Sequence, residues 1–345
     1  MTCPLSPVEY AELDSKEGRE WNQLCSPEIY DEGYIKLGKT KGVFARSYLS
    51  FYDRIKNFVI RDDDVWVVSF PKTGTTWTQE LVWCMMNDDG DDDFEKAKKD
   101  LGQRFPYFEV RANWSPRLAS IIEKNVVENE AVSSDKKHFF QDSFTLAENM
   151  ASPRFLKCHL HFSLLPTQLI EKSTKAKIIY VARNPKDTCT SFYHHSCLLD
   201  GYGGTLEQFA EQFITDNVFC SPFWTHLKEF WERRDRDDIL FLTYEDMKKD
   251  LPSVIQKTAK FLGKAELSPE QVRKLADHLS FEKMKVNPFV NQESVVENLR
   301  KIHGRTYDST FMRKGKVGSW QDELSVAIVA KMDAWIAENR IEGLY

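Results

Sequence analysis

Short apolar runs, each followed by a turn and then by a helical pattern, recur along the chain. The runs at 65–70, 177–182 and 239–244 predict strands that are buried on both faces, and 155–158 is a fourth candidate strand. Strands that alternate with helices favour an α/β fold with a central, mostly parallel sheet flanked by helices. In such sheets ligands bind beyond the carboxyl ends of the strands, so the loops after these runs are the first candidates for a site.

Apolar residues at helical spacing follow three of these predicted strands. The apolar positions after the first strand are Trp77, Leu81, Val82, Cys84 and Met85. A second helix is expected from about Thr188, and a third is led by Pro252, a residue that a first turn tolerates. No internal repeat and no linker rich in Pro or Ser interrupts the pattern, so we expect a single domain over 1–345. One stretch, 113–153, is polar and poorly periodic, and we interpret it as a surface excursion or lid.

The composition is that of a globular protein. Of the 345 residues, 41% are hydrophobic and 29% are charged, which excludes disordered and collagen-like classes. No run approaches the roughly 18 consecutive apolar residues that a membrane span requires. The net charge of −6 and the pI near 5.8 argue against a surface devoted to nucleic acid. If this chain handles an anion, its positive residues must be gathered locally.

The cysteines and the start of the chain predict a reducing, cytoplasmic location. The start has neither the basic region nor the apolar region of a secretory signal. The seven cysteines are scattered and form no CxxC pair, so neither a disulfide framework nor a zinc site is expected. The acidic run 87–93 suggests a calcium-binding EF-hand loop. With Gly90 at the sixth position, however, the twelfth position would be Lys96, where an EF-hand needs a carboxylate ligand. We therefore interpret the run as a solvated loop and expect no metal.

The strongest local signal is the segment PKTGTTW at 71–77, between a predicted strand and a predicted helix. Gly74 lets the backbone approach a ligand, while Thr75 and Thr76 offer hydroxyls and amides at a helix N-terminus, which favours a phosphate. Lys72 adds a full positive charge. The loop is P-loop-like without being a Walker A motif, in which the Lys follows the second Gly. The plain alternative is a turn in which a Thr caps the helix.

Two histidines follow the candidate strand 155–158. A histidine at a carboxyl strand end, such as His159, can stand beside the phosphate loop, and its neutral form suits a general base. His161 lies two residues further on, and alternate positions of an extended segment point to opposite faces, so at most one of the two faces a site. A packed or surface histidine is the structural alternative.

Two further basic elements suit an anion. Arg183 directly follows a predicted buried strand, at the sheet edge where an anion would bind. Its guanidinium can form two parallel hydrogen bonds to a phosphate, and Ser191 follows on the next helix. The structural alternative is a salt bridge between Arg183 and Asp187 at the helix start. The loop FMRKGKVGSW at 311–320 suits either a second phosphate clamp or a flexible surface loop. Four anion-suited elements on an acidic chain suggest a ligand with phosphates at two separated positions.

The chain carries six motifs in an order that resembles the cytosolic sulfotransferases. They are PKTGTTW at 71–77, KCHL at 157–160, ARNPKD at 182–187, LTYEDMKKD at 242–250, SFEKMKVNP at 280–288 and FMRKGKVGSW at 311–320. The resemblance spans about Tyr34 to Trp320. It implies an enzyme of xenobiotic or hormone metabolism that moves a sulfuryl group from 3'-phosphoadenosine 5'-phosphosulfate (PAPS) to the hydroxyl of a small hydrophobic phenol or alcohol. The nucleotide product would be adenosine 3',5'-bisphosphate (PAP).

The resemblance also implies roles for the matching residues. His159 would take the proton from the acceptor hydroxyl, Lys72 would assist the departing bridge oxygen, and Lys157 would stabilise the charge that moves across the sulfuryl group. The 5'-phosphosulfate would be held by Lys72, Thr73, Gly74, Thr75, Thr76 and Trp77. The 3'-phosphate would be held by Arg183, Ser191, Arg313, Lys314 and Gly315. The rest of the predicted nucleotide site is Tyr244, Leu279, Ser280, Phe281, Met284, Phe311 and Met312.

The acceptor side departs from the common family pattern. An acceptor pocket should be apolar with a few polar groups, and its candidate residues are Phe70, Tyr107, Phe108, Lys157, His159 and Phe192. His161 stands where family members commonly have Pro. The stretch 113–153 is longer than in typical mammalian members, and in insect relatives such an insertion covers the acceptor pocket. One such relative uses the same donor to dehydrate retinol, so dehydration of a retinoid-like alcohol is an alternative outcome.

Partners and other function classes stay open at this point. The family's dimer motif is not matched at Gln321, Ser325, Val326 and Ala330, which predicts a monomer or a non-standard dimer. An ATP-dependent small-molecule kinase is disfavoured by the lysine spacing of 71–77 and because Asp187 alone could hold magnesium near a strand end. A non-catalytic carrier of an apolar ligand would be favoured only if His159 points away from the pocket.

Overall fold

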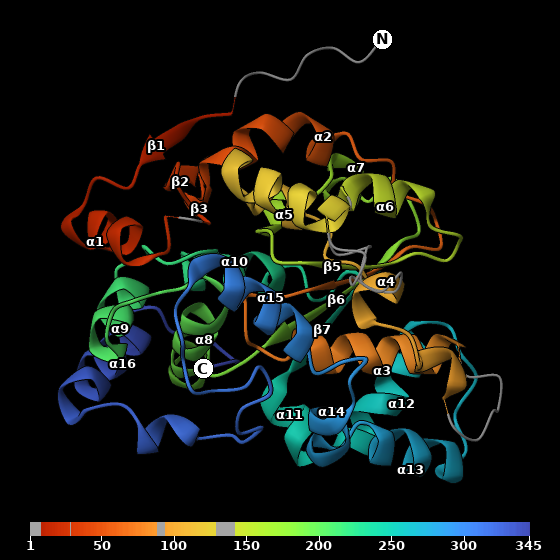
Figure 1. Ribbon diagram of the computed structural model, residues 1–345. Helices are drawn as coiled ribbons and strands as arrows, with labels where there is room; N and C mark the ends of the chain where they lie inside the picture. Colours follow the sequence, from red (N-terminus) through yellow and green to blue (C-terminus); the bar gives the residue numbers. More distant parts are fainter. Residues whose placement is uncertain (1–7, 28, 88–93, 129–141) are drawn as a thin grey trace.

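A parallel sheet of four strands forms the centre of the computed structural model, which describes residues 8–27, 29–87, 94–128 and 142–345 (Figure 1). The strands are β4 (Val65–Val68), β5 (Phe155–Cys158), β6 (Lys177–Ala182) and β7 (Ile239–Thr243). They are ordered β5-β4-β6-β7, and every neighbouring pair is parallel. The predicted α/β class with a central parallel sheet is therefore confirmed.

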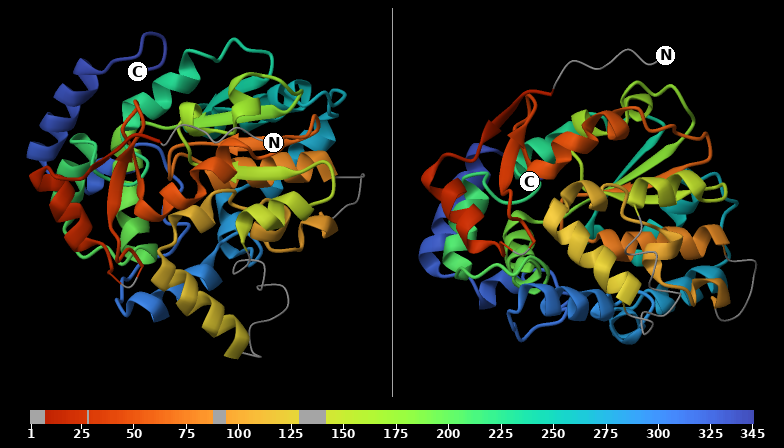
Figure 2. Two further views of the ribbon diagram at one scale, coloured as in Figure 1. Left: turned by 90° about the horizontal axis from the view of Figure 1, so that it is seen from above. Right: turned by 45° about the horizontal axis from the view of Figure 1, so that its top comes forward.

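Helices cover both faces of this sheet (Figure 2). They are α1 (Lys16–Leu24), α2 (Tyr52–Lys56), α3 (Thr75–Asn87), α4 (Leu101–Arg104), α5 (Pro116–Glu128), α6 (Ser143–Asn149), α7 (Thr167–Ile170), α8 (Pro185–Leu199), α9 (Leu206–Ile214), α10 (Phe223–Trp231), α11 (Tyr244–Lys249), α12 (Leu251–Phe261), α13 (Pro269–His278), α14 (Phe281–Val286), α15 (Glu293–His303) and α16 (Val326–Glu338). None of the helices in the described ranges combines the length and apolarity that a membrane crossing needs.

Alternate residues of the central strands face two different hydrophobic clusters. Trp66 and Tyr180 belong to the cluster formed with helices α8 to α10, while Val67 and Val181 belong to the cluster formed with α3, α12 and α13. Successive side chains of a strand point to opposite faces, so a strand covered on both sides must be apolar throughout. This explains why the strands are continuous apolar runs in the sequence.

The parallel register brings four predicted motifs to one edge of the sheet. Val68 pairs with Cys158 on one side and with Tyr180 on the other, and Ala182 pairs with Thr243. The carboxyl ends of all four strands therefore lie side by side. The segments that leave them are the loop 71–74, His159, Arg183 and Tyr244.

A second, antiparallel sheet was not predicted. It consists of β1 (Tyr10–Glu12), β2 (Tyr34–Leu37) and β3 (Gly42–Ala45), in the order β1-β2-β3. In Figure 1 this sheet is drawn in red at the upper left of the molecule. β3 is completely buried, so tertiary packing stabilises this short strand, whereas β1 is exposed and is held by its pairing with β2.

The stretch 113–153 contains two helices in its described part. Helix α5 buries Leu118 and Ile122 in a small cluster with Trp114, and α6 packs Phe144 edge-to-face against Phe108. Both helices are drawn in yellow at the top of Figure 1. Residues 129–141 of this stretch, and 88–93 of the acidic run, lie outside the described residues.

Candidate active site

The loop between β4 and α3 has an unusual backbone, which a glycine permits and a hydrogen bond to β6 holds in place. Lys72 adopts a φ of 69° and Gly74 a φ of 115°, and the left-handed region is costly for a residue with a Cβ. A Cβ on Gly74 would lie 3.0 Å from the ring of Tyr244, the first residue of α11, so this close approach favours glycine. Thr73 Oγ1 donates to the carbonyl oxygen of Val181 on β6 at 2.8 Å. The loop is therefore locked against the neighbouring strand.

Positive charges gather above this loop. Burial, followed by repulsion from Lys157, Arg183 and Arg313, lowers the pKa of Lys72 to about 7. Lys72 Nζ lies 4.0 Å from the centre of the Phe311 ring, so an aromatic face rather than a carboxylate accompanies the ammonium. Four cations grouped on a chain with a net charge of −6 create a local potential that favours a polyanion.

Arg183 is held at the carboxyl end of β6 by backbone groups. Its Nη1 donates to the carbonyl oxygen of Lys72 at 3.2 Å, and its Nη2 donates to that of Lys316 at 3.0 Å. The Tyr244 ring lies 4.3 Å from its Cζ. Arg183 Nε is buried and has no hydrogen-bond partner within the described part of the chain. Within the described residues no carboxylate forms an ion pair with the guanidinium, although Glu245 lies close enough to feel its charge.

Asp187 does not form the salt bridge with Arg183 that was the structural alternative. Its carboxylate accepts hydrogen bonds from the amides of Gly318 at 2.7 Å and Trp320 at 3.1 Å. These bonds tie the start of α8 to the C-terminal loop. Both oxygens of Asp187 are engaged in this way, which further weakens the kinase alternative, because that alternative needed Asp187 as a magnesium ligand.

The loop 311–315 closes over the same region. Arg313 and Lys314 both form ion pairs with Glu323, with Lys314 Nζ 2.8 Å from its Oε1. A Cβ on Gly315, whose φ is 62°, would lie only 2.2 Å from the Phe281 ring on α14. Of the two interpretations of this loop, a clamp held in place fits these contacts better than a flexible surface loop.

A cavity of about 360 Å³ lies among these elements. Lys72, Lys157 and His159, the three predicted catalytic residues, all border it. The predicted nucleotide-site residues that border it are Lys72, Gly74, Thr75, Thr76, Trp77, Arg183, Ser191, Tyr244, Leu279, Ser280, Phe281, Met284, Phe311, Met312, Arg313, Lys314 and Gly315. The exception is Thr73, whose buried hydroxyl donates to the carbonyl oxygens of Phe70 and Val181.

His159 follows β5 and is fixed on three sides. Its Nδ1 lies 2.7 Å from the carbonyl oxygen of Ser69, its amide donates to Glu109 Oε1 at 2.5 Å, and its carbonyl oxygen accepts from His226 Nε2 at 3.1 Å. Burial, and then the charge of Lys157, hold the pKa of His159 well below its usual value. The imidazole is therefore neutral near pH 7, as a general base must be.

His161 points away from the cavity, as expected for alternate positions of an extended segment. It is buried, and its Nε2 lies 3.0 Å from the carbonyl oxygen of Cys220. Its ring packs edge-to-face against those of Phe44 and His226. Burial lowers the pKa of His161 to about 4. We conclude that this histidine has a packing role.

Lys157 stands beside His159 as a second buried cation. Burial lowers the pKa of Lys157 to about 8, and the negative charge of Glu109 opposes that shift. Its Nζ lies 4.3 Å from the centre of the Tyr107 ring. The pKa of Glu109 is itself raised to about 7 by burial. The Lys157 ammonium is therefore poorly solvated and available to a ligand anion.

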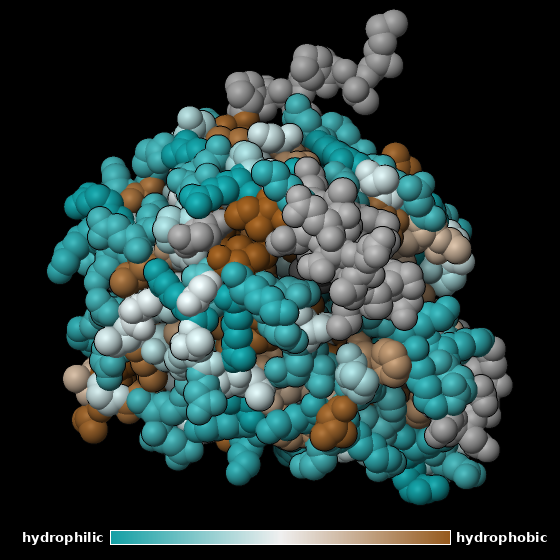
Figure 3. Space-filling model, viewed as in Figure 1, coloured by the Kyte–Doolittle hydropathy of each residue, from teal (hydrophilic) through white to brown (hydrophobic). Residues whose placement is uncertain are grey.

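A second cavity, of about 190 Å³, meets the first at Lys157 and His159. Tyr107 and Phe192 border it, as predicted for the acceptor pocket. On the face shown in Figure 3, hydrophobic side chains gather at the centre, beside the grey residues, within a mostly hydrophilic surface. The two cavities thus share Lys157 and His159, two of the three predicted catalytic residues, while Lys72 borders the first cavity alone.

Phe70 and Phe108 were predicted to line the acceptor pocket, and the structure corrects both predictions. Each is buried in the core and borders neither cavity. Phe70 packs edge-to-face against Phe213 and Phe223, and Phe108 packs against Trp66 in the same manner. Whether such a ring lies in the core or lines the second cavity depends on which helices pack over it.

Several residues of the second cavity were not selected from the sequence. His195 borders both cavities, and its Nδ1 is buried without a partner within the described residues. The i to i+4 spacing from Ser191 was a usable signal, because it puts both residues on one face of α8. Trp114, Leu118 and Ile122 also border this cavity, so the stretch 113–153 contributes part of its wall.

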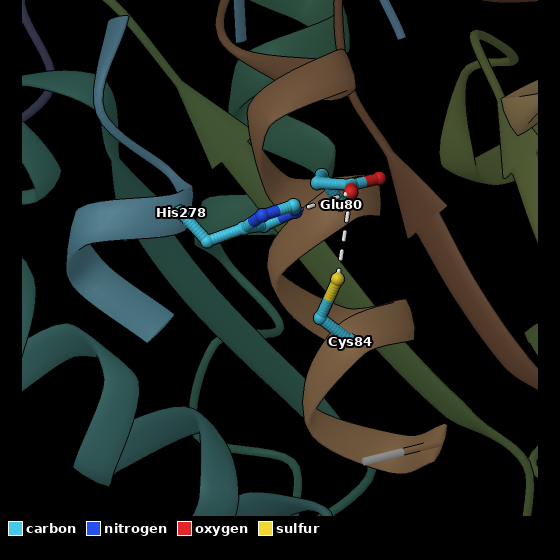
Figure 4. Close-up of side chains that lie close together, drawn as sticks. All are labelled: Glu80, Cys84 and His278. Atoms are coloured by element: carbon cyan, nitrogen blue, oxygen red, sulfur yellow. Dashed lines mark hydrogen bonds and ion pairs between the residues drawn. The ribbon is translucent and has the colours of Figure 1, made fainter. Parts of the chain in front are cut away.

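Glu80, Cys84 and His278 form a separate cluster, which borders neither cavity (Figure 4). Their ligating atoms lie within 4.8 Å of one another, and these residue types can bind metals. Glu80 Oε1 lies 2.8 Å from His278 Nε2, and Glu80 Oε2 accepts from Arg104 Nη2 at 2.6 Å. Because donors already occupy both carboxylate oxygens, we interpret the cluster as an ion-pair network that joins α3, α4 and α13.

Comparison with known proteins agrees with this site. The sulfotransferase domain model matches residues 62–342. Luciferin sulfotransferase of Photinus pyralis is 39% identical over 306 residues, which cover 89% of this chain and 79% of that protein. Amine sulfotransferase of Oryctolagus cuniculus is 34% identical over 293 residues, which cover 84% and 85%. The crystal structure of retinol dehydratase with retinol and PAP has a TM-score of 0.83 and 31% identity, covering 99% and 98%. This chain belongs to the sulfotransferase family.

Proposed function

We propose that this enzyme transfers a sulfuryl group from PAPS to the hydroxyl of a small hydrophobic phenol or alcohol and releases PAP. The observation that carries the proposal is the meeting of two cavities at Lys157 and His159. One cavity is lined by cations and the other mainly by apolar side chains. Retinol dehydratase, which is similar over 99% of this chain, is known in complex with retinol and PAP.

The first cavity fits a nucleotide with two anionic ends. The repulsion that Lys72 experiences from Arg183 and Arg313 would be relieved by an anion between them. Arg183 Nε, buried and without a partner in the described ranges, offers a further donor. Trp77 and Tyr244 pack edge-to-face with ring centres 5.5 Å apart, and both border the cavity, so they offer it an aromatic surface on which a purine could pack.

The two anionic ends would be held by different elements. Lys72, together with Thr75 and Thr76 at the N-terminus of the 13-residue helix α3, would bind the 5'-phosphosulfate. Arg183 and Ser191, with Arg313, Lys314 and Gly315 of the closing loop, would bind the 3'-phosphate. The side chains of α14 and the ring of Phe311 would border the base and ribose.

In the reaction, the bound donor supplies an activated sulfuryl group. Nε2 of His159 takes the proton from the acceptor hydroxyl, since Nδ1 is occupied by the carbonyl oxygen of Ser69. Lys157 stabilises the negative charge that moves across the reacting centre, and Lys72 donates a proton or hydrogen bond to the departing oxygen. In-line transfer of this kind needs a base on the incoming side and cations on the outgoing side, and the proposal requires neither a metal nor a covalent enzyme intermediate.

We further propose that the chain forms one sulfotransferase domain over 1–345, in which 113–153 covers the acceptor pocket. Trp114, Leu118 and Ile122 support this role, because they border the second cavity. A cover of this kind excludes water from the reacting groups and so strengthens their electrostatic interactions.

A PAPS-dependent dehydratase of a retinoid-like alcohol is the second candidate function. The high TM-score of 0.83 to retinol dehydratase over nearly the whole chain favours it. In that case the alcohol would be sulfated first, and the sulfate group would then leave with loss of a carbon-bound proton. The two outcomes differ in product and share the same nucleotide site.

Calorimetric titration tests the nucleotide site before any acceptor is known. We expect PAP to bind more tightly than 5'-AMP, which lacks the 3'-phosphate, and more tightly than ATP with magnesium. Preferential binding of ATP would support a kinase instead. Binding of a hydrophobic phenol without any turnover in the presence of PAPS would support a carrier.

A further inference from the structure

The carboxylate of Asp200 borders the second cavity, and no described basic residue forms an ion pair with it. Asp200 lines the second cavity, and its Oδ1 accepts a hydrogen bond of 2.8 Å from the hydroxyl of Tyr30, another lining residue. Burial raises the pKa of the Asp200 carboxyl to about 6, so the group is mainly ionised above pH 7. Within the described residues, no lysine, arginine or histidine forms an ion pair with it.

Asp200 is also badly placed for helix stability. It is the C-cap residue of α8, where the helix presents the negative end of its dipole. A carboxylate at this position is destabilised rather than stabilised by the helix. Hydrogen bonds from Tyr30 and Ser196 offset part of the cost of burying its charge, and a cation bound in the cavity would offset more.

Helix α8 connects this carboxylate to the site of chemistry. Ser191 borders the first cavity, His195 borders both cavities and Leu199 borders the second, at successive intervals of four residues. The rise from Ser191 to Asp200 is about 13 Å, at about 1.5 Å per residue. Asp200 thus lies on the acceptor side, away from the end of α8 that borders the nucleotide cavity.

We propose that Asp200, with Tyr30, is an anchor for a cationic group on the acceptor, so that the preferred acceptor is a phenol or alcohol that carries an ammonium group at its other end. The proposal rests on the proposed function, because it assumes that the second cavity holds the acceptor. An ammonium ion supplies the positive charge with which no described residue pairs Asp200, and adds hydrogen-bond donors to that of Tyr30. An acceptor with a carboxylate in that position is repelled.

A structural role is the alternative explanation for Asp200. Its backbone carbonyl accepts from the amide of Ser26, and the bond from Tyr30 ties the same segment to α8. The substitution Asp200→Asn separates the two roles. An asparagine oxygen can still accept from Tyr30, so the tie is kept while the charge is removed.

The test uses phenols that differ only in the end of a para tail of two or four carbons. With the two-carbon tail they are tyramine, 4-ethylphenol and tyrosol, and 3-(4-hydroxyphenyl)propionate supplies the carboxylate. For the native enzyme we expect kcat/KM for the ammonium compound of the fitting length to exceed that of the uncharged 4-alkylphenol with the same number of tail carbons about tenfold or more. The carboxylate compound should fall below both. In Asp200→Asn the ammonium preference should disappear while 4-ethylphenol is still sulfated.

Asp216→Asn is a matched control. Burial also raises the pKa of Asp216 to about 6, but Asp216 borders neither cavity, so its substitution should leave the ammonium preference unchanged. Equal kcat/KM for all tails, or an ammonium preference that survives in Asp200→Asn, would overturn the anchor. Sulfation of 4-ethylphenol tests the proposed function separately, because that compound has no charged tail. If no phenol is sulfated, titration of the same compounds into PAP-loaded protein still decides the charge preference.

Discussion

Nδ1 of His159 lies 2.7 Å from the backbone carbonyl oxygen of Ser69, the residue that directly follows β4. A carbonyl oxygen can only accept, so the proton of the neutral imidazole is on Nδ1 and the basic lone pair is on Nε2. The central strand of the sheet therefore selects the tautomer of the proposed base. The hydrogen bond from His226 to the His159 carbonyl fixes the same residue from the opposite side.

The first prediction concerns this base. His159→Ala should lower kcat by about 100-fold to 10,000-fold, because the acceptor hydroxyl loses its proton acceptor. The Kd of PAP should change little, since the nucleotide is bound mainly by other residues. Steady-state kinetics and calorimetry on the same preparation measure both quantities. A fully active variant would refute the assignment of the base.

The second prediction concerns the nucleotide clamp. Arg183→Ala should raise the Kd of PAP by about 10-fold to 100-fold, as expected for the loss of charge-assisted hydrogen bonds to a phosphate. Arg273→Ala, on the exposed surface of α13, is the matched control and should leave the Kd unchanged. If both variants bind PAP equally well, the 3'-phosphate is not held by Arg183.

The third prediction is a pH dependence of nucleotide binding. The pKa of Lys72 in the ligand-free protein is lowered to about 7, whereas the bound polyanion favours the protonated lysine. Above pH 7, binding must therefore take up a proton, and the Kd of PAP should rise by up to about tenfold per pH unit. Lys157, with a pKa of about 8, should add to the slope at higher pH.

Titrations with PAP between pH 6 and 9 measure this slope. In Lys72→Arg the side chain stays charged throughout this range, so the slope should be flatter than in the native enzyme. A Kd that is independent of pH in the native enzyme would contradict the depressed pKa of Lys72.

The fourth prediction concerns stability away from the site. Arg154 forms two hydrogen bonds to the carboxylate of Asp64, Nε to Oδ1 at 2.8 Å and Nη2 to Oδ2 at 2.5 Å, and both side chains are almost fully buried. Asp64→Ala leaves the guanidinium buried without its partner, so the free energy of unfolding should fall by about 3–5 kcal/mol. Asp237→Ala, which removes the partner of Lys172 in an exposed pair, should have no measurable effect in the same urea titrations. Equal stability of the two variants would contradict this account.

The central sheet could be predicted because its strands are apolar runs with clear turns behind them. The first strand was expected to reach residue 70, but β4 ends at Val68, since the chain turns away there into the loop. Helix α8 begins at Pro185, three residues before the expected start at Thr188. The side chain of Asn184 accepts from the amide of Lys186 and caps the helix, so Asn184 followed by Pro185 is a local signal for this start.

The rest of the fold and part of the site depend on contacts between distant segments. Strands of three or four residues, such as β1 and β3, are too short to show a periodic pattern. Phe70 is a core residue because rings more than 120 positions later in the chain pack against it, among them Phe192, Phe213 and Phe223. The cationic motifs were easier to place, because the parallel topology alone puts every strand end at one edge.

The most direct test of the central claim follows the sulfuryl group itself. The enzyme is incubated with PAPS labelled in its sulfuryl group and with a panel of phenols and allylic alcohols, and the products are identified by mass spectrometry. We predict a labelled sulfate ester and PAP in equal amounts with at least one acceptor, or, for an allylic alcohol, labelled inorganic sulfate with the dehydrated product. No labelled product with any acceptor, together with no stabilisation of the protein by PAP, would contradict the account.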